Sequence, residues 1–296
     1  PEVLCVGAAA IDRVYSLLGE TRLHTSNPAD GHRGFGGVAR NVAENLARLG
    51  LDVALASIVG VDRDGVLLRR HLQECGIDTS RLIVSDRHST AEYVAILDTN
   101  QQLVLGASQM TIFDDFTIAH LQAALNNLSE DAWIFADCNL PSDVLELLFE
   151  RRRQKLAVNA VSIEKVAHLP RDLAGAEIVF FNESEARAYI DAARIDEPLE
   201  LAREIYRRGP GAVVVSCGAK GVSVASVGML TRHPAAQTRI VDVTGAGDAL
   251  VAGTLFARTE GKSLGEAVTI GARLAALTLE TAGSVHQELS RAMLLG

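Results

Sequence analysis

The most informative stretch of this sequence is Val241-Asp242-Val243-Thr244-Gly245-Ala246-Gly247-Asp248, because it sets one carboxylate beside a turn that has almost no side chains. Small residues at 245–247 leave backbone N–H groups uncovered, and the apolar run from Ala249 to Phe256 predicts a helix directly after them. Free N–H groups and the dipole at a helix N-terminus favour an anion. A carboxylate there would repel a resting phosphate, but it fits if Asp248 accepts a proton from a hydroxyl that attacks the phosphate. The pattern therefore favours phosphoryl transfer, with an ordinary glycine turn and a capping Asp as the structural alternative.

Size and composition indicate a large globular α/β chain. Its 296 residues can form one large domain or two ordinary ones. About half of them, 48%, are hydrophobic, and only 4% are aromatic. A core dominated by alanine, valine, leucine and glycine is typical of buried parallel strands covered by closely packed helices.

Charge and cysteine usage exclude several classes of protein. The net charge of −9 argues against general nucleic-acid binding, which needs lysine and arginine to neutralise phosphates. The basic run at residues 151–153 follows an expected helix, Ser142–Glu150, and is interpreted as its solvated C-terminal end. Four scattered cysteines without a CxxC pair are expected to be reduced and mostly buried: Cys5, Cys75, Cys138 and Cys217. No signal peptide and no apolar run of ~20 residues is seen, so we expect a cytoplasmic protein without a membrane partner.

Short apolar runs alternate with segments of helical spacing along most of the chain. The expected strands are Val3–Ala10, Val53–Val59, Ala132–Ala136, Leu156–Val158, Ile178–Phe181, Ala212–Cys217 and Val222–Ala225. The expected helices include the segment from Val38 to Leu49, closed by Gly50, and the segments Gly65–Glu74, Ile118–Asn127 and Leu199–Arg208. Alternation of this kind predicts an α/β fold with a mainly parallel sheet sandwiched by helices.

Two segments break this alternation. Residues 12–33 are polar and rich in turn residues, and residues 89–108 contain two apolar runs around Thr99-Asn100 that predict an antiparallel hairpin. We expect these pieces, roughly 12–35 and 89–108, to form a small β-sheet lid on a single domain that spans residues 1–296.

Two glycine patterns that resemble nucleotide-binding motifs are rejected. The segment from Gly34 to Ala39 satisfies G-x-G-x-x-A, but a dinucleotide site needs a buried strand directly before it, and residues 27–33 are not expected to form one. Gly261-Lys262-Ser263 resembles the end of a P-loop, but Phe256 stands where the first glycine belongs.

Several polar residues are candidates for binding hydroxyl groups. Gly36 and Gly37 enter the helix that carries Asn41, whose amide falls on the apolar side of that helix. Such an amide needs partners, either backbone groups or the hydroxyls of a bound polyol. Asp12 is expected at the end of the first strand, where open α/β sheets bind ligands.

Two further segments each have a structural and a functional interpretation. Asn182 and Glu185, after an expected strand, form a capping box or hold a Mg²⁺ shell through water. Ser216-Cys217-Gly218-Ala219-Lys220-Gly221 is a hairpin turn or lines a nucleotide.

Taken together, these segments resemble the ribokinase-like (PfkB) family of sugar and nucleoside kinases over nearly the whole chain. The resemblance implies phosphorylation of a primary alcohol by ATP and Mg²⁺, with Asp248 as the base. It also implies an anion hole from the N–H groups of Gly245, Ala246 and Gly247, metal support by Asn182 and Glu185, and ATP binding by Ser216, Gly218 and Gly221. Asp242 and Thr244 match positions that hold a monovalent cation in some members. Val243 and residues 278–286 depart from the pattern, which argues against potassium dependence.

Within this family the sequence is most similar to pseudouridine kinases. The similarity rests on Ser26-Asn27-Pro28, on the segment from Gly36 to Asn41, and on Ala136-Asp137-Cys138-Asn139. It implies that Asp12, Gly36, Gly37, Asn41 and Asn139 surround the ribose and that Ser26 and Asn27 read the base. The Ser-Asn-Pro segment is otherwise a simple turn. The alternatives are a kinase for ribose, inosine or adenosine and, from another class, a non-catalytic ligand-binding protein of the same fold. Lid-to-lid homodimers are common in the family, and an exposed lid edge can pair.

Overall fold

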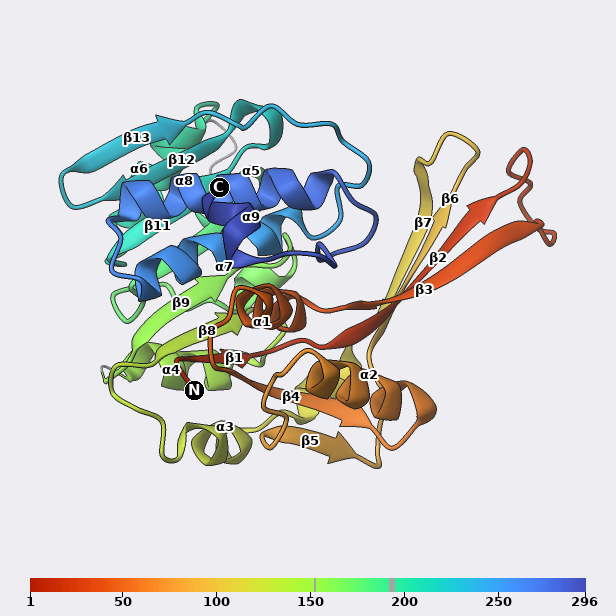
Figure 1. The fold of residues 1–296 in the computed structure, drawn as a ribbon, viewed down its shortest axis with the longest axis horizontal. Coiled ribbons are helices and arrows are strands. Elements are labelled where there is room, and N and C mark those ends of the chain that lie inside the picture. Colours follow the sequence, from red (N-terminus) through yellow and green to blue (C-terminus); the bar gives the residue numbers. More distant parts are fainter. Residues whose placement is uncertain (152, 192–194) are drawn as a thin grey trace.

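The computed structural model describes residues 1–151, 153–191 and 195–296, so the central arginine of the basic run at 151–153 lies outside the described residues. Within them, a nine-stranded sheet has the order β13-β12-β11-β10-β9-β8-β1-β4-β5 (Figure 1). Strands from β11 to β5 are parallel, and β12 and β13 are antiparallel additions at one edge. The strands are β1 (Val3–Val6), β4 (Val53–Gly60), β5 (Leu82–Ser85), β8 (Trp133–Asp137), β9 (Lys155–Asn159), β10 (Ile178–Asn182), β11 (Ala212–Ser216), β12 (Val222–Ser226) and β13 (Met229–His233).

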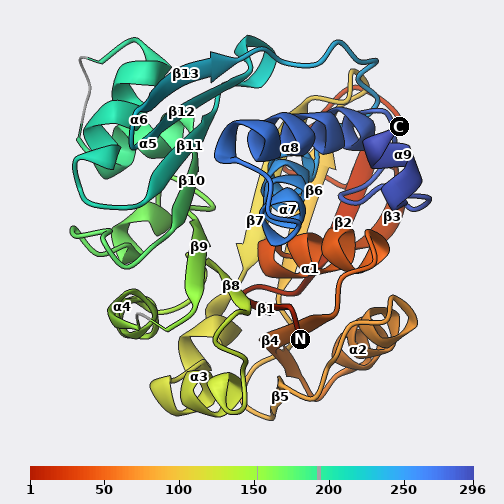
Figure 2. The same cartoon turned by 60° about the vertical axis from the view of Figure 1, so that its left-hand side comes forward.

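Helices cover both faces of this sheet, as expected from the alternation in the sequence. Figure 2 shows α1, α2, α7 and α8 on one side and α3 to α6 on the other. Their bounds are α1 (Val38–Arg48), α2 (Arg63–Glu74), α3 (Ile118–Leu125), α4 (Ser142–Glu150), α5 (Glu183–Tyr189), α6 (Pro198–Tyr206), α7 (Ala246–Thr259), α8 (Leu264–Leu279) and the short α9 (Arg291–Leu295). Short 3₁₀ segments lie between β7 and α3 (η1, Thr111–Asp115), between β9 and β10 (η2, Lys165–His168) and between β11 and β12 (η3, Gly218–Lys220).

Two hydrophobic cores result, one on each face of the sheet. Successive residues of a strand point to opposite faces, so Leu4 and Val6 of β1 enter the core with α3 and α4, whereas Val3 and Cys5 enter the core with α1 and α7. All four of these side chains are fully buried. This two-sided burial explains why the strands are continuous apolar runs and do not alternate.

A second sheet, here called the lid sheet, stands away from the core, with the order β3-β2-β6-β7 (Figure 1). It consists of β2 (Ala10–Leu17), β3 (Ala29–Gly36), β6 (Glu92–Leu97) and β7 (Leu103–Gln109). The antiparallel pairing of β6 with β7 confirms the hairpin predicted in 89–108.

Two details of the sequence interpretation were wrong. Asp12 does not end the first strand, because β1 stops at Val6 and Asp12 lies inside β2 of the lid sheet. Residues 29–36 do form a strand, since β3 pairs with β2 through backbone hydrogen bonds that need no apolar side chains. That strand is mostly exposed and lies outside the core sheet, so the segment from Gly34 to Ala39 still lacks the buried strand that a dinucleotide site requires.

Ion pairs fasten the base of the lid sheet to α2. The Nε of Arg13 on β2 donates to Glu92 of β6 at 2.7 Å, and the same guanidinium contacts Asp64 of α2. Arg33 of β3 also donates to Asp64, at 3.0 Å. Across residues 1–151, 153–191 and 195–296, no helix combines the length and apolar character needed to traverse a lipid bilayer.

Candidate active site

The turn at 245–247 and the helix after it form as the sequence predicts. Gly245 caps α7 in the left-handed conformation (φ 77°), and Asp248 lies in the first helical turn. A Cβ on Gly245 would lie 2.0 Å from the carbonyl oxygen of Ser284, so both the conformation and the space require glycine. The first backbone N–H groups of α7 have no acceptor within the helix, so they are free to bind an anion.

Asp248 lies in an environment that favours its protonated form. Burial raises the pKa of its carboxyl to about 7, and the charges of Asp137 and Asp12 act in the same direction. The hydrogen bond from Asn41 Nδ2 to Asp248 Oδ2, 2.6 Å long, and the charge of Arg40 oppose this rise. A carboxyl with a pKa near neutrality is well suited to accept a proton in a reaction at neutral pH.

Asp12, Gly36, Gly37 and Asn41 gather beside Asp248. Asp12 covers Gly36 so closely that a Cβ there would lie 2.2 Å from its Oδ1. Gly37 is the N-cap of α1 at φ 91°, and a Cβ on it would meet the carbonyl oxygen of Ala8 at 2.5 Å. Asn41 is 5% exposed. Carboxylate and amide groups around bare backbone can bind several hydroxyls of one small molecule.

Asn139 and the fully buried Asp137 form a support behind this group. The backbone N and Nδ2 of Asn139 donate to Asp137 Oδ1 at 2.9 and 3.0 Å, and the N–H groups of Ala8 and Ala39 donate to Oδ2, both at 2.9 Å. Asp137 thus ties the ends of β1 and β8 to the start of α1. Asp137 has no predicted role of its own, although its place directly after the apolar run Ala132–Ala136 could have indicated one.

Asp248 also lines a cavity that shares wall residues with a larger groove. The cavity, about 170 Å³, is lined by Asn182, Glu185, Ser216, Gly247 and Asp248 among others. The groove, about 910 Å³, shares Ser216 and Gly247 with the cavity and also includes Gly218 and Gly221. Apolar side chains missed by the sequence analysis form much of its wall: Ala235, Ala236, Ala272, Ala275, Ala276 and Leu279. The helical spacing of the last four residues, all on α8, resembles that of an ordinary core-facing helix.

Asn182 and Glu185 form the capping box considered for them, and they line the cavity beside Asp248. They form a complete capping box at the start of α5, in which Asn182 Oδ1 accepts from the N–H of Glu185 and Glu185 Oε2 accepts from the N–H of Asn182, both at 2.8 Å. Glu185 is 4% exposed, and burial raises the pKa of its carboxyl, although the bond from the Asn182 backbone opposes this. A buried carboxylate and an amide oxygen beside the cavity are suitable oxygen donors for Mg²⁺ or its water shell.

Asp242 holds the residues before the glycine turn at 245–247 in place. Its Oδ1 accepts from the N–H of Thr244 at 2.9 Å and its Oδ2 from the N–H of Gly283 at 3.0 Å. These bonds lower the pKa of the Asp242 carboxyl, although burial acts against them. Oδ1 therefore fixes the local backbone before the turn, and Oδ2 links this segment to the loop after α8.

The structure does not bring Ser26 and Asn27 to the other candidate residues. They lie in the loop between β2 and β3, at the far end of the lid sheet (Figure 1). The five residue-to-residue steps from Asp12 to Leu17 already span about 17 Å of extended strand. The side chain of Asn27 bonds the backbone N and O of Arg22 within the loop, at 2.9 and 2.8 Å. Within one chain, these contacts are those of a turn.

Comparison with known proteins supports a kinase fold throughout. The pattern of the pfkB family carbohydrate kinases matches residues 1–290. The pseudouridine kinase of Escherichia coli is 25% identical over 292 residues, which cover 97% of this chain and 93% of that protein. A carbohydrate kinase from Agrobacterium tumefaciens is 31% identical with a TM-score of 0.84, covering 99% of this chain and 95% of the other. The ribokinase of Arabidopsis thaliana complexed with ribose and ATP is 18% identical with a TM-score of 0.83, covering 100% and 97%. The family resemblance inferred from the sequence is confirmed, and the chain belongs to the pfkB family of carbohydrate kinases.

Proposed function

We propose that this kinase transfers the γ-phosphoryl group of ATP to the 5′-hydroxyl of pseudouridine, giving pseudouridine 5′-phosphate and ADP. The observation that carries the proposal is the position of Asp248. It contacts Asn41 and lies near Asp12, and it lines the small cavity that shares Ser216 and Gly247 with a groove of the size of a nucleotide site. The reaction needs ATP, and we place it in the cytoplasm.

Asp248 acts as the general base in this proposal. It accepts the proton of the 5′-hydroxyl while that oxygen attacks the γ-phosphorus, and the N–H groups of Gly245, Ala246 and Gly247 stabilise the negative charge on the transferring group. Asp12, Gly36, Gly37, Asn41 and Asn139 hold the ribose. Most of the rate enhancement comes from alignment and charge stabilisation, because phosphoryl transfer requires little covalent chemistry of the protein.

The groove takes ATP, with the base against the alanines of α8 and the phosphates toward Gly245. Ser216, Gly218 and Gly221 lie along it, and the complex of the Arabidopsis ribokinase with ATP supports an adenine nucleotide in this fold. Asn182 and Glu185 would hold Mg²⁺ through water, and the ion would neutralise phosphate charge. Asp242 and Thr244 are the residues that would support a monovalent cation.

The choice of pseudouridine rests on the Escherichia coli relative and on the segments named in the sequence analysis. We further propose that the lid sheet closes over the acceptor and that the protein is a homodimer joined through its lid sheets. Supporting this, β7 is an exposed edge strand whose Leu103 and Leu105 are each 58% exposed. The proposed base-reading role of Ser26 and Asn27 depends on this dimer, because within a single chain they lie away from the other candidate residues.

The experiment is ADP release with ATP and Mg²⁺, comparing pseudouridine, uridine, inosine, adenosine and ribose at equal concentration. A preference for pseudouridine over uridine supports the proposal, because the two differ only in how the base is attached. If ribose or another nucleoside is turned over faster, the proposed substrate is wrong but the proposed phosphoryl transfer stands. Nucleotide binding without any turnover favours a non-catalytic member of the fold.

A further inference from the structure

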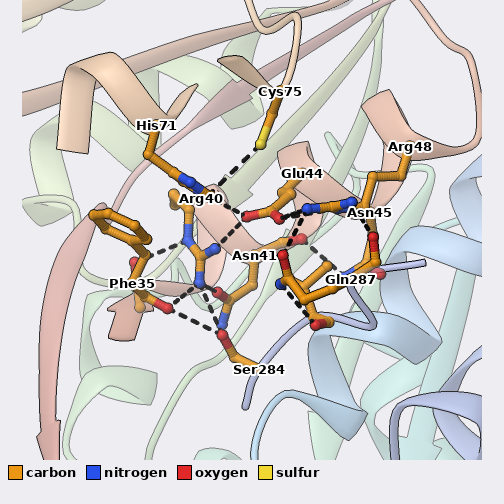
Figure 3. Close-up of polar contacts among 12 residues, drawn as sticks. Phe35, Arg40, Asn41, Glu44, Asn45, Arg48, His71, Cys75, Ser284 and Gln287 are labelled. Carbon is orange, nitrogen blue, oxygen red and sulfur yellow. Dashed lines mark hydrogen bonds and ion pairs between the residues drawn. The ribbon is translucent and has the colours of Figure 1, made fainter. Parts of the chain in front are cut away.

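Arg40 lies directly behind the acceptor site, and the mechanism above gives it no role. It is 2% exposed, on the first turns of α1. Figure 3 shows its guanidinium surrounded by oxygen atoms from several elements. Nη1 donates to Glu44 at 2.5 Å, and Nη2 donates to Asn41 Oδ1, to the carbonyl oxygen of Phe35 and, at 2.8 Å, to Ser284 Oγ.

The chemistry of these partners permits only one orientation of the Asn41 amide. A guanidinium only donates hydrogen bonds, and an ionised carboxylate only accepts them. Asn41 lies between Arg40 and Asp248, so its Oδ1 must face Arg40 and its Nδ2 must face Asp248. Without Arg40 the amide would be free to turn, and its contacts to the base and to the acceptor would no longer be fixed.

We propose that Arg40 is a positioning residue that fixes the Asn41 amide toward Asp248 and the acceptor hydroxyls, and so sets the affinity for the sugar. This inference rests on the proposed function, because it assumes that the acceptor occupies the space beside Asn41.

Glu44 keeps Arg40 in place. Its carboxylate is fully buried and accepts from Arg40, from Arg48 at 2.7 Å and from His71 at 2.8 Å. Burial opposes its ionisation, but the bond from His71 and the charge of Arg40 hold the pKa of Glu44 at about 2. Cys75 lies beside His71, so the three side chains have the composition of a metal site. Glu44 already serves two arginines, however, and their charges disfavour a cation there. The cluster therefore anchors Arg40.

Arg40 also connects the two sides of the active site. It donates to the carbonyl oxygens of Phe35 and Gly36, where the lid sheet joins α1. Ser284, another of its partners, has its own carbonyl oxygen against Gly245 in the turn before Asp248. Phe35 itself stacks on His71, with ring centroids 4.1 Å apart. The Arg40 guanidinium thus links β3 of the lid sheet to α1 and, through Ser284, to the turn at Gly245.

The test is a double-mutant cycle with Arg40→Met and Asn41→Ala, measured as the dissociation constant for pseudouridine by calorimetry and as kcat and KM. Alone, Arg40→Met should weaken acceptor affinity about 10- to 100-fold, the effect of losing one well-placed charged hydrogen bond. In the Asn41→Ala background the same change should cost less than about threefold, since the two residues act as one unit. Arg48→Met is the matched control, because Arg48 shares Glu44 but does not contact Asn41. It should leave acceptor affinity unchanged.

A second readout is the pH profile. The charged groups that face Asp248 are Asp12 from β2, Asp137 from β8 and Arg40 from α1. Loss of the Arg40 charge should move the acidic limb of kcat/KM to higher pH in Arg40→Met. Arg48→Met and Arg40→Lys should not show this shift, because both keep a positive charge at position 40. If Arg40→Met does not fold, Arg40→Lys provides the cycle, because an ammonium lacks the planar fork that reaches acceptors on several elements at once.

Equal losses from Arg40→Met in both backgrounds, or an equal loss in Arg48→Met, would overturn the inference. That outcome leaves the proposed function intact, since the parent enzyme still phosphorylates pseudouridine. If the parent enzyme binds ribose but not pseudouridine, the cycle with ribose decides the role of Arg40 while the proposed substrate fails. If the parent enzyme binds neither ribose nor pseudouridine, both the inference and the proposed function are overturned.

Discussion

The pH dependence of acceptor phosphorylation follows directly from the surroundings of Asp248. Burial, together with the charges of Asp137 and Asp12, raises the pKa of its carboxyl from 3.8 to about 7. A general base works only when ionised, so a raised pKa removes activity on the acidic side of neutrality. Activity is therefore expected to be full well above pH 7 and to fall as the pH decreases through 7.

The size of the change can be calculated from this value. With one titrating base of pKa near 7, the ionised fraction is about 90% at pH 8, about 50% at pH 7 and about 10% at pH 6. The value of kcat/KM for the acceptor should therefore fall about 10-fold between pH 8 and pH 6. A carboxyl at its ordinary pKa of 3.8 would give a flat profile over that range.

The assay is kcat/KM for the acceptor at saturating ATP and Mg²⁺ from pH 5.5 to 8.5, at constant ionic strength. Asp12→Asn serves as the comparison, because it removes a negative charge that raises the pKa of Asp248. Its acidic limb should lie at lower pH than that of the parent enzyme, whatever its effect on acceptor affinity. A parent profile that is flat between pH 6 and 8 would refute the reasoning.

Three further predictions concern the turn, the buried ion cluster and the lid sheet. Gly245→Ala should lower kcat at least about 10-fold and reduce Tm, because its Cβ meets the Ser284 carbonyl at 2.0 Å, whereas Gly247→Ala, with open space around it, should keep its Tm. His71→Gln should cost about 1–3 kcal/mol of unfolding free energy at pH 6 and much less at pH 10. Burial opposes protonation of His71, but hydrogen bonds with Cys75 and Glu44 raise its pKa to about 9. The stability that this shift contributes is complete below pH 6.5 and is lost as the pH rises through 9. Leu105→Lys should shift the mass measured by light scattering from dimer to monomer; an unchanged mass would place any interface elsewhere.

The features that the sequence predicted correctly depend on local rules. The glycine turn before Asp248, the capping box at Asn182 and the hairpin in residues 89–108 are each set by neighbouring residues. Two-sided burial likewise makes the core strands visible as apolar runs. For these elements, backbone conformation and periodicity are enough.

The features that were missed depend on contacts between distant parts of the chain. Polar residues of β3 form a strand only because β2 supplies backbone partners, and no periodicity of their own shows this. Arg40 resembles a surface residue of an amphipathic helix until Glu44, Phe35 and Ser284 are seen around it. The base-reading role of Ser26 and Asn27 stays a prediction, because within one chain they lie at the far end of the lid sheet and only contacts between chains would bring them to a base.

The most direct test of the central claim is product analysis by ³¹P NMR and mass spectrometry after incubation with ATP, Mg²⁺ and pseudouridine. The parent enzyme should form one pseudouridine 5′-phosphate for each ADP, and Asp248→Asn should form the same product about 10²- to 10⁴-fold more slowly. Its affinity for pseudouridine should be largely retained. ADP without a phosphorylated nucleoside, a phosphate on another hydroxyl, or an undiminished rate in Asp248→Asn would contradict the account.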